Sequence, residues 1–171
     1  MKILLAILGV LLAGGVALSG YMGLFRKILV EEREEGPFTL VYQELDSVDM
    51  RRVGEITTAL NDLLAKHEIE RRKPLDVFFP DGRSEIGFAV EGAAPDRLAA
   101  LSGGAKVREI PARRCMVTRF PWRNTMSFMA GYFKVDPALA RHREARGYEK
   151  VEAYALNEGD TILYMQPIVP R

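Results

Sequence analysis

The sequence has few of the residues that cross-link a small domain or hold a metal ion. Its 171 residues include one cysteine, Cys115, and two histidines, His67 and His142. A single thiol forms no internal disulfide and no cysteine-based metal site. Cys115 alternates with Val117 in a strand-like pattern, so we expect a buried, unreactive thiol, and both histidines are expected to be exposed on helices. No metal and no cofactor is expected.

An excess of charge of either sign is also missing. The 24 Lys and Arg residues nearly cancel the 23 Asp and Glu residues, which leaves a net charge of +1. Such a balance gives no electrostatic reason to expect nucleic acid as a partner. The sequence also lacks GxSxG, HExxH and a Ser-His-Asp order. The familiar hydrolase motifs therefore give no support for catalysis.

One long apolar run is present. Residues 3–25 carry no charge, Lys2 precedes them, and Arg26 and Lys27 follow. A helix of this length crosses about 30 Å of hydrocarbon at about 1.5 Å per residue. We therefore expect residues 1–27 to be a single-pass membrane anchor, with the lipid bilayer as a partner. A cleaved signal peptide ending near Ser19 is the alternative. The flanking basic residues are too evenly balanced to assign the side of the membrane.

The first half of the remaining chain reads as strand, helix, strand, strand. Residues 31–36, "EEREEG", are a solvated connector or a polar strand face. Strand-forming residues occupy 38–45, and an apolar stripe at helical spacing follows, for which Ser47 or Asp49 is a candidate cap. The turn Pro80-Asp81-Gly82 then separates strands at 75–79 and 85–92.

The second half repeats that order. Pro111 interrupts a strand region at residues 106–120, so pairing is expected to begin after it. A helix starts at Met126, is broken and restarted at Asp136-Pro137, and ends at Gly147. Two strands around residues 157–160 form a closing hairpin.

These patterns predict an α+β fold built from two β-α-β-β repeats, 28–92 and 105–171, joined by a linker at 93–104. The repeats are expected in a pseudo-twofold arrangement, with antiparallel sheet on one side and helices on the other. A cleft between the two halves is the expected place for a ligand.

The step Phe120-Pro121-Trp122 and the ending "VEAYAL…GDTILYMQPI" resemble the GyrI-like effector-binding domain of bacterial transcription regulators. Within that family, "VTRFPWRNTMSFMAGYFKVDPALARHREARGYEKVEAYAL" is most similar to the membrane-anchored, testis-expressed type of ER-phagy receptor. The disordered tail of that receptor type has no counterpart before the last residue, Arg171. The resemblance therefore implies the fold and the anchor, and not the autophagy role.

The resemblance also implies an acidic ligand-binding residue on the penultimate strand, where Glu152 stands. Alternation places Val151, Ala153 and Ala155 beneath a helix and turns Glu152 and Tyr154 to the open face. A carboxylate among aromatic rings suits a cation. The alternative is that Glu152 pairs with Arg114 or Arg119 across a solvated sheet. The candidate ligand-binding residues are Glu152, Tyr154, Trp122, Tyr164 and Tyr42.

Three functions remain open. The first is a membrane-tethered, non-catalytic domain that binds an amphipathic or cationic small molecule in the cleft. The second is a protein-interaction or adaptor module at the membrane, which predicts a filled cleft and an exposed apolar patch. The third, implied by the resemblance, is a hydrolase of cyclopropane-containing compounds in which Glu152 and Tyr154 act as base and acid. The lining of the cleft discriminates among them.

Overall fold

The structure is a computed structural model that describes residues 12, 14, 15, 18–21, 23, 25–46 and 49–171. The side chains of 50 and 125–130 are not described. Most of the apolar run at 3–25, and Ser47, lie outside this description. No helix within the described ranges combines the length and the apolar character needed to span a bilayer.

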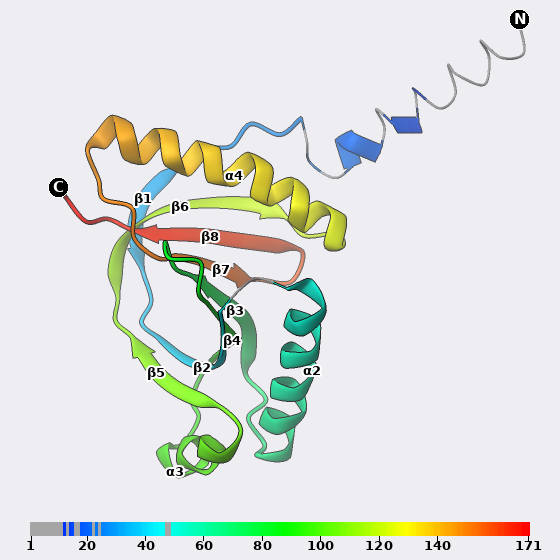
Figure 1. Ribbon diagram of the computed structural model, residues 1–171, viewed down its shortest axis with the longest axis vertical. Coiled ribbons are helices and arrows are strands. Elements are labelled where there is room, and N and C mark those ends of the chain that lie inside the picture. The colour runs from blue at the N-terminus through cyan, green and yellow to red at the C-terminus, as the bar shows by residue number, and fades with distance from the viewer. Residues whose placement is uncertain (1–11, 13, 16–17, 22, 24, 47–48) are drawn as a thin grey trace, which may run out of the picture.

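Eight antiparallel strands of the described chain form one sheet (Figure 1). The strands are β1 (Glu31–Glu35), β2 (Phe38–Leu45), β3 (Arg72–Phe78), β4 (Ser84–Val90), β5 (Lys106–Ile110), β6 (Arg113–Pro121), β7 (Ala153–Asn157) and β8 (Thr161–Pro167). The helices are α2 (Met50–Lys66), α3 (Pro95–Ala99), a short 3₁₀ turn (Ala100–Gly103) and α4 (Thr125–Arg146). The spatial order of the strands is β1-β6-β8-β7-β3-β4-β2-β5. The architecture is therefore α+β, as predicted.

The strand order is symmetric about the β7–β3 pair. Reading outward, β3, β4, β2 and β5 on one side correspond to β7, β8, β6 and β1 on the other. Each repeat is thus β-β-α-β-β, one strand longer than predicted, and its first strand pairs with the other repeat. The polar segment "EEREE" is the edge strand β1, which pairs with β6, and "KVREI" is β5, which pairs with β2.

The prediction that pairing begins after Pro111 was wrong. Residues 111–112 form the corner between β5 and β6, and both of these strands are paired. Because the proline stands between two ladders, its missing N–H costs no inter-strand hydrogen bond.

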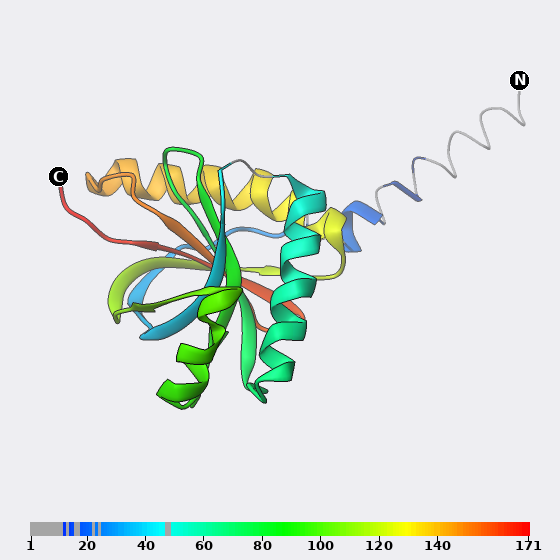
Figure 2. The same ribbon diagram turned by 60° about the horizontal axis from the view of Figure 1, so that its bottom comes forward.

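Both long helices cover the same face of the sheet (Figures 1 and 2). Asp49 caps α2, since its carboxylate accepts a hydrogen bond of 2.9 Å from the backbone N–H of Arg51. Leu60 and Leu64 of α2 pack on the β2–β4 side in a buried cluster. Helix α4 packs on the β6–β8 side. It runs without a break through Pro137, so the predicted break and restart there was wrong.

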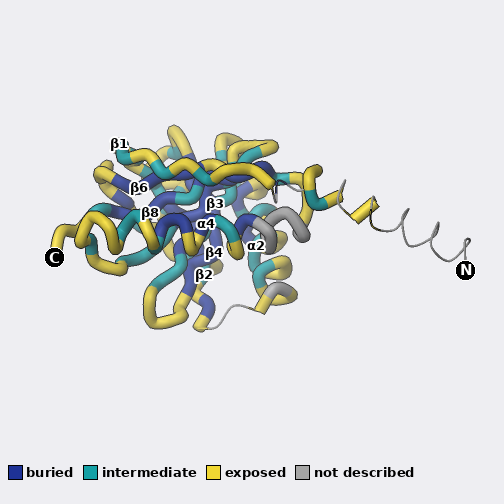
Figure 3. The backbone as a smooth tube through the Cα atoms, turned by 90° about the horizontal axis from the view of Figure 1, so that it is seen from above, coloured by how far each residue is buried: buried dark blue, intermediate teal, exposed yellow. Residues whose placement is uncertain are grey.

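The opposite face of the sheet, called here the inner face, is closed by its own side chains. One buried cluster on it joins residues of β2 and β5 to residues of β6, at the two ends of the strand order. A flat sheet keeps such strands apart, so the sheet curls around this cluster. Leu75, Val77 and Met165 at its centre have no exposed surface. Figure 3 shows this buried centre within a partly exposed shell.

Glu32 of edge strand β1 binds His142 of helix α4 and so links the two elements. The Glu32 carboxylate lies 3.0 Å from His142 Nε2 and accepts hydrogen bonds of 3.1 Å from the Tyr148 hydroxyl and from Arg114 Nη2. The hydrogen bond with His142, with help from Tyr148 and nearby arginines, lowers the pKa of Glu32. His142 is half-buried in this contact, so the prediction of an exposed helix histidine was wrong for it.

Gly87 permits the close approach of β2 to β4 that the curl requires. A Cβ atom at this position would lie 2.1 Å from the Val41 carbonyl oxygen and 2.9 Å from Tyr42 Cα. No side chain fits there, because both contacts are with backbone atoms that cannot turn aside. Gly87 therefore fixes the position of Tyr42 on the inner face.

We predict that Gly87→Ala destabilises the full chain by about 3 kcal/mol, because the methyl group forces β2 and β4 apart. The matched control is Gly54→Ala on exposed α2, where no atom lies within 4 Å of the added Cβ. That substitution should stabilise by about 0.5–1 kcal/mol through helix propensity. Urea unfolding followed by circular dichroism measures both. Equal midpoints for Gly87→Ala and the natural chain would contradict the close packing.

Candidate functional site

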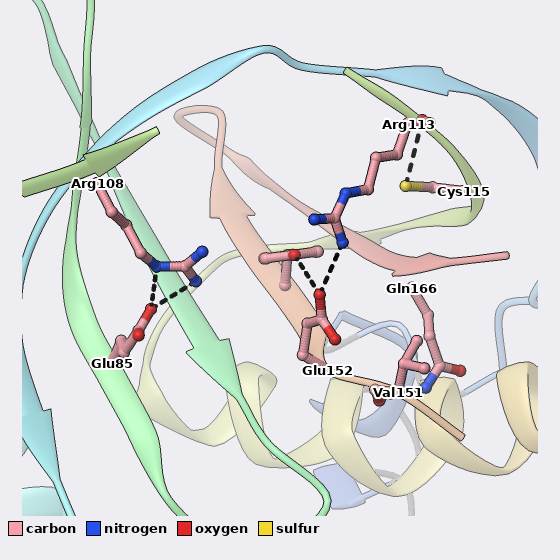
Figure 4. A network of polar contacts seen from close by, with 8 residues as sticks. Glu85, Arg108, Arg113, Cys115, Val151, Glu152 and Gln166 are labelled. Atoms are coloured by element: carbon pink, nitrogen blue, oxygen red, sulfur yellow. Dashed lines mark hydrogen bonds and ion pairs between the residues drawn. The ribbon is translucent and has the colours of Figure 1, made fainter. Parts of the chain in front are cut away.

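Glu152 reaches the inner face just before β7 begins. Its Oε1 accepts one hydrogen bond of 3.0 Å from Arg113 Nη1 and another of 2.9 Å from the Tyr154 hydroxyl (Figure 4). Its side chain is 23% exposed, and that of Arg113 is 44% exposed. Since both donors meet on one oxygen and no described residue donates to Oε2, half of the carboxylate is left for a further donor.

Glu152 and Tyr154 face away from the helices, as the alternation predicts, but that face is closed and Tyr154 is buried in it, so the expectation of an open face was wrong. Tyr154 belongs to the buried inner cluster, whereas Ala155 alternates to the helix side, opposite Asp76 and Tyr164. The alternative, an arginine partner for Glu152, is observed, although the partner is Arg113 and neither Arg114 nor Arg119. Arg114 points to the helix face, where it binds Glu32.

A second carboxylate–arginine pair lies on the same face. Glu85 of β4 accepts hydrogen bonds of 2.8 and 2.6 Å from Nε and Nη2 of Arg108 on β5 (Figure 4). The Arg108 guanidinium lies 5.9 Å from the centre of the Tyr42 ring, a cation–π distance. Tyr42 therefore belongs to this second pair, which is anchored in the first half of the chain.

Burial keeps two phenols and the thiol of the inner face protonated. It raises the pKa of the Tyr154 phenol, and the hydrogen bond to Glu152 raises it further. Burial likewise raises the pKa of Tyr42, and it raises that of the Cys115 thiol to about 11. The two phenols are thus neutral hydrogen-bond donors at physiological pH, and the thiol is inert. Cys115 is buried, as predicted.

Tyr164 does not share this face, and the prediction that it does was wrong. It packs with the α4 cluster and its hydroxyl is buried there without a hydrogen-bond partner among the described residues. A Cβ at Gly131 of α4 would lie 2.8 Å from that hydroxyl. The alternation of β8 decides this, because Leu163 and Met165 take the inner face.

Trp122 stands at the other end of the sheet. It follows β6 directly, and its backbone N–H donates to the Asp160 carbonyl in the β7–β8 turn at 2.7 Å. Arg113, which holds Glu152, begins β6, nine residues earlier. At ~3.3 Å per residue that is roughly 30 Å of strand, so Trp122 and Glu152 do not form one site.

The sequence prediction missed Arg113, Arg108 and Glu85. A usable signal was present for Arg113, since it shares the alternation of Cys115 and Val117, which were expected to be buried. No local pattern indicated Glu85 and Arg108. They are 23 positions apart, and they meet only because β2 pairs with β4 on one side and with β5 on the other.

The inner face joins a carboxylate to a guanidinium and to a phenol. Tyr154, a buried phenol with a raised pKa, is a poor acid. Within the described ranges, no group of three His, Cys, Asp or Glu side chains is arranged to hold a metal ion. Two surface hollows, one lined by Arg26 and Arg119 and the other by Arg71 and Arg97, contain none of the residues of the two pairs.

Comparison with known proteins places the fold. No family model matches the sequence, and no curated protein matches it. The C-terminal domain of EcmrR superposes with a TM-score of 0.64 at 10% identity, over 84% of this chain and 99% of that one. SAV2435 bound to tetraphenylphosphonium gives 0.59 at 12% identity, over 82% and 93%. A hydrolase from Listeria innocua gives 0.55 at 12% identity, over 84% and 92%.

These likenesses show that the chain has the GyrI-like fold of effector-binding domains. At such identities they show the fold alone. None of the three neighbours is of the ER-phagy receptor type, so nothing supports that finer resemblance.

One carboxyl on the helix face is strongly perturbed. Asp76 of central strand β3 keeps some accessible surface, yet burial raises its pKa from an ordinary 3.8 to about 7. A long hydrogen bond of 3.3 Å from the Gly87 N–H offsets this only in part. Between about pH 4 and 7 the folded chain therefore holds a proton that the unfolded chain releases, and stability falls as pH rises.

We predict that Asp76→Asn removes this pH dependence. The stability of the variant relative to the natural chain should rise by about 1–3 kcal/mol from pH 4.5 to pH 8, because the amide carries no charge to desolvate. Urea unfolding across that range measures the difference. Asp62→Asn, on the exposed side of α2, is the control and should show no such trend. A constant difference for Asp76→Asn would show that the carboxyl is well solvated.

Proposed function

We propose that this protein is a ligand-binding domain of the effector-binding type, tethered to a membrane through residues 1–27, in which Glu152 holds the charge of a lipophilic cation. One observation carries the proposal. The carboxylate stands on the inner face of an effector-binding fold and already binds a guanidinium and a phenol at 3.0 and 2.9 Å.

Arg113 occupies the position of the ligand charge. Its guanidinium is a planar cation held by the carboxylate whose charge a bound ligand would use, and it is the more exposed partner of the pair. An incoming cation therefore competes with an internal one. The neighbour SAV2435 is described with tetraphenylphosphonium bound, which makes this lipophilic cation a suitable probe.

The ligand also has to open the inner face. Tyr154 is 4% exposed and Tyr42 is 8% exposed, and the apolar side chains between them are packed. A bulky ligand displaces some of these contacts, so binding selects a state in which the two halves of the curled sheet part. The measured affinity is then reduced by the small population of that state.

We predict that Glu152→Gln weakens binding of tetraphenylphosphonium at least tenfold, because the amide keeps the shape but not the charge. Isothermal titration calorimetry with the purified full chain measures this. Glu149→Gln is the matched control: it removes the same charge from an exposed position three residues earlier and should leave the affinity unchanged. Equal affinities for Glu152→Gln and the natural chain would rule out the carboxylate as the cation site.

We predict that Arg113→Gln changes the affinity for tetraphenylphosphonium in the opposite direction. Removing the internal cation should tighten tetraphenylphosphonium binding about three- to tenfold, because the ligand no longer displaces a guanidinium. The control is Arg114→Gln, the next residue on β6, whose partner Glu32 lies on the helix face. If Arg113→Gln binds more weakly, the arginine contacts the ligand instead of competing with it.

The interaction module remains the second candidate, for a specific reason. The inner face is closed, and α4 exposes two adjacent rings, Tyr132 at 56% and Phe133 at 68%. An exposed apolar patch of this kind is typical of a protein-interaction surface. Failure of all lipophilic cations to bind, together with loss of a membrane partner on Phe133→Ser, would favour this candidate.

A further inference from the structure

A basic hollow lies where the N-terminal segment passes the edge of β6. It measures about 180 Å³, and Arg26, Lys27 and Arg119 are among the residues that line it. Since a water molecule takes roughly 30 Å³ of liquid, a phosphate group has room there. Figure 1 shows this segment leaving β1 beside β6 and α4, on its way to the N-terminus.

The charges of the hollow are unbalanced. Its three cationic side chains face a single carboxylate, Glu31. None of the three forms an ion pair with a described residue, whereas the arginines at the start of the same strand β6, Arg113 and Arg114, are both paired. Three convergent cations without counter-ions form a binding site for an anion of more than one negative charge.

Exposed apolar side chains flank the basic pair of the hollow in the sequence, and one of them, Leu29, lines it. Tyr21, Phe25 and Leu29 are 63%, 71% and 63% exposed, and they bracket the basic pair Arg26-Lys27 in the sequence. Aromatic and aliphatic side chains interleaved with basic ones are characteristic of segments at the interface between lipid and water. A free phosphate ion gains nothing from such neighbours.

Helix α4 extends this surface. Lys134 Nζ donates a hydrogen bond of 2.6 Å to the Arg26 carbonyl, which ties the helix to the N-terminal segment. The exposed rings of Tyr132 and Phe133 directly precede Lys134, and they contact each other edge to face at 5.8 Å. Exposed apolar side chains therefore occur both on the N-terminal segment and on the helix that contacts it.

We propose that this hollow binds the phosphate of an anionic phospholipid headgroup, and that α4 rests on the bilayer surface beside it. Arg119 of β6 supplies the contact from the folded domain, and Arg26 and Lys27 supply those from the segment that enters the membrane. The inference rests on the proposed tethering, and it is independent of the cation site on the inner face. It gives the domain a fixed orientation relative to the lipid, which a flexible tether does not.

The test uses the full chain in mild detergent and three soluble probes: dihexanoyl phosphatidic acid, dihexanoyl phosphatidylcholine and inorganic phosphate. Calorimetric titration should show phosphatidic acid binding at least tenfold more tightly than either other probe. Arg119→Gln should weaken that binding about fivefold, the expected loss for one basic residue near an anionic lipid. The control Arg71→Gln, which neutralises an exposed arginine in a second hollow elsewhere on the surface, should leave the binding of phosphatidic acid unchanged.

Each result of these titrations either supports or overturns the proposed headgroup site. Equal binding of inorganic phosphate would show a free-anion site and overturn the lipid assignment. An unchanged affinity of Arg119→Gln for phosphatidic acid, or equally tight binding of phosphatidylcholine, would overturn the site itself. Tetraphenylphosphonium binding and carbonate-resistant membrane association are measured separately, so loss of the headgroup site is distinguishable from failure of the ligand site or of the tether.

Discussion

The antiparallel pairing of β3 with β7 is the contact on which the rest of the structure depends. It joins the two halves of the chain in one sheet, with Leu75 opposite Leu156 and Val77 opposite Tyr154. These four side chains lie in the inner cluster, to which both halves contribute. Burial of that shared apolar surface makes the curled sheet one unit, because neither half has enough inner surface to form a core alone.

The corner between β5 and β6 links this architecture to function. The chain crosses there from the first half to the second, and it carries an arginine on each side: Arg108 before the corner and Arg113 after it. Each arginine neutralises a carboxylate of the half it joins, Glu85 in the first and Glu152 in the second. The inner face thus carries two internal ion pairs. In each pair the carboxylate keeps one oxygen without a donor among the described residues, and the proposed ligand exchange falls on the Glu152 pair because it is the more exposed of the two.

The two proposed binding surfaces use opposite charges in different places. The inner face offers a carboxylate to a cation, whereas the hollow at the β6 edge offers three cations to an anion. Strand β6 contributes to both, with Arg113 at its start and Arg119 near its end.

Local patterns of the sequence determined the α+β class, the helix α2 with its Asp49 cap, the closing hairpin and the inner-face alternation of Glu152 and Tyr154, because periodicity and turn chemistry act over a few residues. Three features became known only from the tertiary structure. Glu152 binds Arg113, β1 and β5 each pair with the other half, and Trp122 lies far from the site. Those features depend on strand pairing across long stretches of chain, and no local pattern encodes it. For the same reason Tyr164 was assigned to the wrong face: the register of β8 is set by its partners β6 and β7.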